Sequence, residues 1–238
     1  MNFDTTSINE KIYRLLRERI IFGDYAPGSR IEIKQLTREL EVSPQPVKEA
    51  LFRLSGEGFI TILQRRGTYV RQASLKDLAN MVEARILYET GAIDLSVGQI
   101  RDGDLRRLEA LCDDLRKTKD KSYKEIQKRN MAFHCAVVGL AKNHWLDKAH
   151  ELLMGHYASL HYRYVVKKKA YSDAQQIYKD HRKVIDALGK GDFGGAKQIT
   201  RLHMQRVKDK IEEELFSYDT AAGSSDHGKV AAEHLSVD

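Results

Sequence analysis

Four side chains in the second half of the chain are of types that bind a transition metal. Asn130 and His134 are four residues apart, so a helix would place both on one face, about 6 Å apart at Cβ. His181 and His203 each lie among apolar residues at helical spacing, which indicates faces turned at least partly inward. Three imidazoles and an amide oxygen in one bundle would suit Zn²⁺, Ni²⁺ or Mn²⁺. The alternative is that each histidine is an ordinary hydrogen-bonded helix residue.

A second group of side chains, in the first third of the chain, is suited to DNA. A short helix predicted over residues 46–55 has one apolar face, and its other face is polar and basic. Ser43 precedes this helix at an N-cap position, where a hydroxyl and free amides can hold a phosphate. The predicted DNA contacts are Lys34, Ser43, Gln45, Lys48, Arg53, Arg65 and Arg66. Arg65 and Arg66 lie between two predicted strands, and the alternative is that these two side chains only solvate the turn.

The elements that would position this second group are short and mixed. Ser7 to Glu10 forms a capping box, and the apolar stripe after it ends at Gly23. The sequence then predicts helices over 33–40 and 46–55 and strands over 59–63 and 68–70. Helices followed by a β-hairpin with a basic tip occur in this order in a winged helix-turn-helix domain.

The rest of the chain has no proline, and its apolar residues recur with a period of about 3.6. The pattern predicts helices over residues 76–98, 103–119, 122–142, 145–167, 172–189 and 193–216. We therefore expect a mainly α fold, with a winged helix-turn-helix followed by an all-α bundle of six or seven helices. The predicted domains are 1–72 for DNA binding, 73–216 for the bundle, and a flexible tail over 217–238.

Composition limits the classes of protein that fit. The net charge of +6 and the pI near 9.1 permit nucleic acid as a partner. Cys112 and Cys135 are too few for a disulfide framework, which favours a reducing compartment. The first ten residues do not resemble a secretory signal, and no apolar run reaches the roughly 18 residues that span a bilayer. We expect a cytoplasmic protein with no membrane contact.

The first domain resembles the DNA-binding domain of GntR-family transcription regulators. The resemblance rests on Tyr25–Ile31, Val42–Leu51, Leu54, Glu57–Gly58 and Gly67–Val70. The family usually has arginine, threonine and arginine where this chain has Pro44, Gln45 and Lys48. The change at position 44 removes a guanidinium that would contact guanine, and Gln45 is suited to adenine instead.

The second domain resembles the FCD effector domain of the FadR-like GntR branch, over about residues 76–212. The matching segments are Val82–Glu89, Asn130–His134, Asp180–Leu188 and His203. In metal-containing members an acid and three histidines bind the ion, and the matching positions here are Asn130, His134, His181 and His203. Because Asn130 stands where aspartate is usual, the site loses one negative charge, and weaker metal binding is expected.

The resemblance also implies a small organic acid as effector. An open position on the metal would accept its carboxylate, and Arg85, which matches a family arginine, would complete the clamp with a bidentate hydrogen bond. The alternative for Arg85 is a helix ion pair with Glu89, four residues on.

These observations predict a ligand-responsive transcription regulator, not an enzyme, that binds a palindromic operator as a homodimer. A metal-dependent hydrolase that uses the three histidines is the alternative, although no H-E-x-x-H motif is present. A third possibility keeps DNA binding but has an apolar, metal-free cavity in the bundle.

Overall fold

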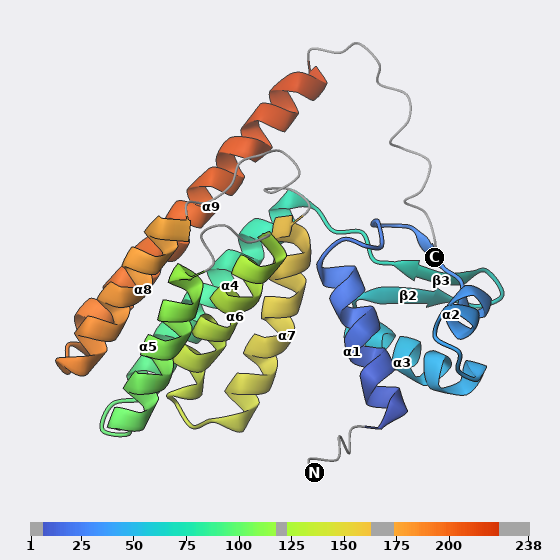
Figure 1. Ribbon diagram of the computed structural model, residues 1–238. Helices are drawn as coiled ribbons and strands as arrows, with labels where there is room; N and C mark the ends of the chain where they lie inside the picture. The colour runs from blue at the N-terminus through green and yellow to red at the C-terminus, as the bar shows by residue number, and fades with distance from the viewer. Residues whose placement is uncertain (1–6, 118–122, 163–173, 224–238) are drawn as a thin grey trace.

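A computed structural model describes residues 7–117, 123–162 and 174–223 (Figure 1). The residues up to Val70 form the part that we call the head. Its elements are α1 (Ile8–Ile21), β1 (Arg30–Ile31), α2 (Ile33–Glu39), α3 (Pro44–Gly56), β2 (Ile60–Leu63) and β3 (Gly67–Val70). The three strands form one antiparallel sheet in the order β1-β3-β2. The winged helix-turn-helix is confirmed, and the two-residue strand β1 is an addition that the sequence did not predict.

The apolar spacing of the head accounts for its core. Val47, Ala50, Leu51 and Leu54 of α3 are all buried, together with Leu16 and Ile20 of α1 and Leu36 of α2. Helix α3 begins at Pro44, two residues before the predicted start. Pro44 and Pro46 both lie in the first turn of α3, where the backbone N–H groups have no partner inside the helix. The register Ile62 to Thr68 sets the β2–β3 hairpin, which we call the wing.

The bundle consists of the helices that follow. They are α4 (Leu75–Leu95), α5 (Asp102–Arg116), α6 (Tyr123–Gly139), α7 (His144–His161), α8 (Ala174–Gly189) and α9 (Phe193–Gly223). Helix α9 continues past the predicted end at residue 216, so residues 217–223 of the predicted tail are helical, whereas 224–238 lie outside the described residues. The predicted end of α7, at residue 167, also lies outside them. None of the described helices combines the length and the apolar character needed to cross a membrane.

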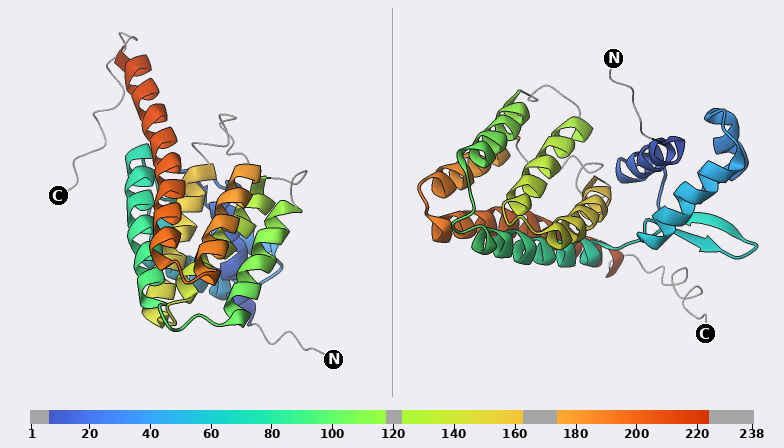
Figure 2. Two further views of the ribbon diagram at one scale, coloured as in Figure 1. Left: turned by 90° about the vertical axis from the view of Figure 1, so that its left-hand side faces the viewer. Right: turned by 90° about the horizontal axis from the view of Figure 1, so that it is seen from below.

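The head lies at one end of the bundle, beside α7 (Figure 2, right). The His156 ring of α7 stacks on Phe59, with centroids 4.1 Å apart and planes 13° apart. Its Nε2–H donates to the backbone carbonyl of Glu57, at the end of α3, over 2.8 Å. Lys128 of α6 donates to Glu18 of α1 over 2.9 Å. Two helices of the bundle therefore hold the head.

Candidate metal centre and DNA interface

Three of the four predicted metal ligands come together inside the bundle. His134 of α6, His181 of α8 and His203 of α9 are buried, and one nitrogen from each lies within 4.8 Å of the others. The ring centroid of His134 is 5.0 Å from that of His181 and 5.5 Å from that of His203. A cavity of about 10 Å³ lies among the rings, which is room for one ion or one water molecule.

Hydrogen bonds determine which nitrogens face this cavity. His134 Nδ1 lies 2.8 Å from Glu89 Oε2, and His203 Nδ1 lies 3.0 Å from Asp180 Oδ2. An ionised carboxylate only accepts, so Nδ1 carries the proton in each ring and Nε2 is the nitrogen left to bind an ion. The Nε2 atom of His134 and both ring nitrogens of His181 are buried without a hydrogen-bond partner in the described residues. Such atoms fit a metal ion, because each is costly to bury unpaired.

Burial keeps the imidazoles of His134 and His181 in the neutral form that binds metals. It lowers the pKa of His134 to about 3, and it also lowers the pKa of His181 well below its usual value, helped by the two neighbouring histidines. Burial alone would raise the pKa of Glu89, but His134 and Arg85 beside it hold that pKa well below the usual value. At neutral pH the rings of His134 and His181 are therefore neutral, and Glu89 is ionised.

The fourth predicted ligand, Asn130, lies one turn before His134 and is also buried. Its Nδ2 donates to Gln127 Oε1 over 3.3 Å, and its Oδ1 has no hydrogen-bond partner among the residues described. The residues that line the cavity include Glu89 and Asp180 but not Asn130. The carboxylates nearest the rings are thus two that the sequence did not predict.

Arg85 adopts the alternative that the sequence left open. Its side chain is 1% exposed, and its Nε and Nη2 lie 3.1 and 3.0 Å from Glu89 Oε1. The guanidinium carbon is 4.4 Å from the centre of the Tyr157 ring. The cavity at the histidines has no room for an organic acid next to an ion. An effector would therefore need Arg85 to release Glu89, or a wider cavity.

The two missed carboxylates carry only weak sequence signals. Glu89 lies four residues after Arg85, and Asp180 directly precedes His181. Asp180 also forms an ion pair with Arg206 of α9 and accepts from Gln176 over 2.9 Å. These spacings show only that each carboxylate has a neighbour in the sequence. The packing of α4 against α6 and of α8 against α9 determines which histidine ring each carboxylate binds.

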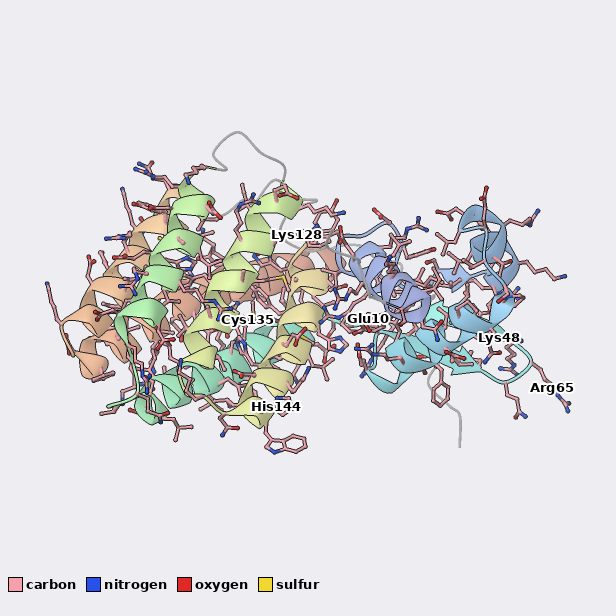
Figure 3. All side chains as sticks on the ribbon, turned by 60° about the horizontal axis from the view of Figure 1, so that its bottom comes forward. Glu10, Lys48, Arg65, Lys128, Cys135 and His144 are labelled. Atoms are coloured by element: carbon pink, nitrogen blue, oxygen red, sulfur yellow. The ribbon has the colours of Figure 1, made fainter. Side chains whose placement is uncertain are left out.

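The candidate DNA interface lies at the end of the head that is far from the bundle. Lys48 and Arg65 both lie at this end (Figure 3). Within the described part of the chain, no hydrogen bond or ion pair involves the exposed side chains of Lys34, Ser43, Lys48, Arg65 and Arg66. The Ser43 hydroxyl does not cap α3, so it is available to another group. Five of the seven predicted DNA residues are therefore free to bind phosphate or bases.

The other two residues have partners inside the head. Gln45 Nε2 donates to Glu49 Oε1 over 2.8 Å, which leaves its carbonyl oxygen as the free group. Arg53 donates to Glu10 over 2.7 Å and to Glu57 over 3.2 Å, and its guanidinium lies 3.5 Å from the centre of the Tyr13 ring. The acids of α1 and of the α3 end thus turn Arg53 toward α1, and DNA contact would require these bonds to break.

Comparisons with known proteins agree with this architecture. The sequence family described as "Bacterial regulatory proteins, gntR family" matches residues 8–70, and the family described as "FCD domain" matches residues 80–206. The transcriptional repressor GlaR of Escherichia coli (strain K12) is 27% identical over 207 residues, which cover 81% of this chain and 90% of GlaR. The regulator LutR of Bacillus subtilis (strain 168) is 24% identical over 210 residues, 79% of this chain and 94% of LutR.

Solved structures show the same fold. E. coli McbR/YncC has a TM-score of 0.75 at 20% identity, and the match covers 89% of this chain and 100% of that chain. These comparisons give the hydrolase alternative no support. The chain belongs to the GntR family of bacterial transcription regulators and combines its DNA-binding helix-turn-helix with an FCD domain.

Proposed function

We propose that this regulator binds a palindromic operator as a homodimer in the cytoplasm and changes its DNA affinity when a small organic acid binds. Residues 1–72 would bind DNA, and residues 73–216 would bind the effector and form the dimer. The support for DNA contact is a set of exposed side chains that have no partner among the described residues: Lys34, Ser43, Lys48, Arg65 and Arg66. Two such heads would read successive major grooves about 34 Å apart.

The bundle would hold a divalent transition metal, with Zn²⁺, Ni²⁺ and Mn²⁺ as candidates. One observation carries this proposal: buried imidazole nitrogens that have no partner in the described parts of the chain surround a cavity the size of an ion. His134, His181 and His203 would bind the ion, and the free Oδ1 of Asn130 would approach as a neutral fourth ligand. The bound ion would supply a positive centre for a carboxylate group of the effector.

Arg85 would bind the other end of that carboxylate. In the present structure it holds Glu89, so effector binding would exchange one carboxylate for another at the same guanidinium. Such an exchange links effector binding to the arrangement of α4, α6 and α7, since Glu89 also contacts His134 and His150. If the two arrangements differ in the spacing of the heads, the effector changes operator affinity.

The test combines a DNA-binding assay with metal analysis. We expect the purified protein to form a specific, salt-sensitive complex with DNA that flanks its own gene. We also expect it to contain about one equivalent of metal, which His181→Ala removes together with the effector response. Exposed His144 provides the matched control, because His144→Gln should keep both. A metal content unchanged in His181→Ala would reject the ligand set, and the absence of any specific complex would reject the operator.

A further inference from the structure

Glu89 is a fully buried carboxylate that four nitrogens surround. Its Oε2 lies 2.8 Å from His134 Nδ1, and its Oε1 accepts from Arg85 Nε over 3.1 Å. Arg85 Nη2 lies 3.0 Å and His150 Nε2 lies 3.4 Å from the same Oε1. These groups come from α4, α6 and α7, so Glu89 joins three helices of the bundle and at the same time lines the cavity between the histidines.

Arg85 makes this buried charge tolerable. A lone carboxylate in a dry interior would take up a proton, whereas a guanidinium at 3.0 Å keeps it ionised. Because the ionised group can only accept, it requires the N–H form of His134 at Nδ1. The second nitrogen, Nε2, is then unprotonated and points away from Glu89, and it is the atom that has no hydrogen-bond partner within residues 7–117, 123–162 and 174–223.

From this geometry we infer that Glu89 is the positioning residue of the metal centre: it fixes the tautomer and direction of His134, and Arg85 holds Glu89 in place. This inference rests on the proposed metal site. Asn130 adds no charge to the site, so the carboxylates that support the rings are Glu89 at His134 and Asp180 at His203. Carboxylates placed in this way increase the basicity of a ligating imidazole, and their removal costs 10–100-fold in metal affinity.

The two supporting carboxylates differ in how they are held. Asp180 is paired with Arg206, whose side chain is 50% exposed, whereas both Arg85 and Glu89 are 1% exposed. Water can replace a partner of Asp180 but not a partner of Glu89. The ring of His134 is consequently held more rigidly than that of His203, and loss of Glu89 should be the more damaging change.

The experiment compares the unchanged protein with two variants of Glu89 and one control variant. Glu89→Gln removes the charge but leaves Arg85 buried and unpaired, which threatens folding. The double variant Arg85→Met with Glu89→Leu removes both ions and keeps the volume, so it should remain folded. Glu83→Gln is the control, because it removes a carboxylate from the exposed face of the same helix, where Glu83 binds Lys208 over 2.6 Å.

The first measurement is the affinity for Zn²⁺ and for Ni²⁺, by competition with a chromogenic chelator. We expect both Glu89 variants to bind 10–100-fold more weakly than the unchanged protein, and Glu83→Gln to bind equally well. Folding of each variant is checked by circular dichroism. If the unchanged protein binds the metals and the folded Glu89 variants bind them within about threefold of it, Glu89 has no positioning role.

The second measurement requires no metal. Proton–nitrogen correlation spectra of the histidine rings in the metal-free protein should show His134 protonated at Nδ1, and the double variant should lose this preference. This result separates two failures. A protein that binds no metal but shows the expected tautomer change contradicts the metal proposal and retains the role of Glu89. A tautomer that is the same with and without Glu89 overturns the inference.

Discussion

The head and the bundle both contain polar side chains without partners in the described residues, but they differ in exposure. On the head, Lys48 and Arg65 are exposed, and water solvates them at no cost to folding. In the bundle, the free nitrogens of His134 and His181 are buried, and each unsatisfied group costs about 1–3 kcal/mol. A ligand of the bundle should therefore change the free energy of unfolding, whereas changes on the head should alter DNA affinity alone.

The largest expected effect is the response of the metal-free protein to acid. Burial lowers the pKa of His134 and of His161 to about 3, against 6.5 for the unfolded chain. The unfolded state therefore binds more protons below pH 6.5, so stability is complete above that pH and is lost as the pH falls toward 3. From pH 7 to pH 5.5 each such histidine costs about 1.3 kcal/mol.

This pH effect is measured by denaturant unfolding in the presence of a chelator. The variant His144→Gln, which removes an exposed histidine, is measured alongside for comparison. A free energy of unfolding that stays constant between pH 7 and 5.5 would show that the histidines are not buried as neutral rings.

The next effect is stabilisation by metal. An ion that binds only the folded protein contributes about 2.7 kcal/mol when its concentration is 100 times Kd. For a chain of this size that raises Tm by about 5–10 °C. Differential scanning calorimetry with Zn²⁺ or Ni²⁺, with and without chelator, measures this shift. If Tm is the same with and without metal, the buried nitrogens of the bundle do not bind an ion, and the expected difference between bundle and head is wrong.

A smaller effect is expected from the recognition helix. Lys48→Ala removes an exposed cation that has no partner among the described residues, so operator affinity should fall about tenfold and the free energy of unfolding should change by less than about 0.5 kcal/mol. Fluorescence anisotropy with labelled operator DNA measures the affinity. Lys76→Ala removes the same charge from the exposed side of α4 and should bind DNA normally. Full affinity in Lys48→Ala would place the reading face elsewhere.

The smallest effect concerns the wing. Arg65→Ala and Arg66→Ala should each reduce the slope of log affinity against log salt by about 0.9 if the side chain contacts one phosphate. Binding is titrated at four or more salt concentrations for each variant. An unaltered slope would mean that the arginines only solvate the turn.

Much of this architecture could be predicted from spacing. The apolar period placed α3 and its buried face, and it indicated that His181 and His203 face at least partly inward. The resemblance to the FCD domain, not the spacing, grouped these two residues with His134. Spacing within one helix could not show that Glu89 meets His134 or that Asp180 meets His203, because these contacts depend on how helices pack. The same limit explains Arg53: its position on α3 indicates a free face, but Glu10 approaches from α1 and binds it.

Helix α7 connects the two regions whose properties differ so strongly. His150, near Glu89, and His156, bonded to Glu57 at the end of α3, are six residues apart on one continuous helix, or about 9 Å along its axis. A rotation or translation of α7 must therefore alter the surroundings of Glu89 and the orientation of the recognition helix together. In this fold, less than two helical turns of α7 separate the surroundings of Glu89 from the contact that holds the end of α3.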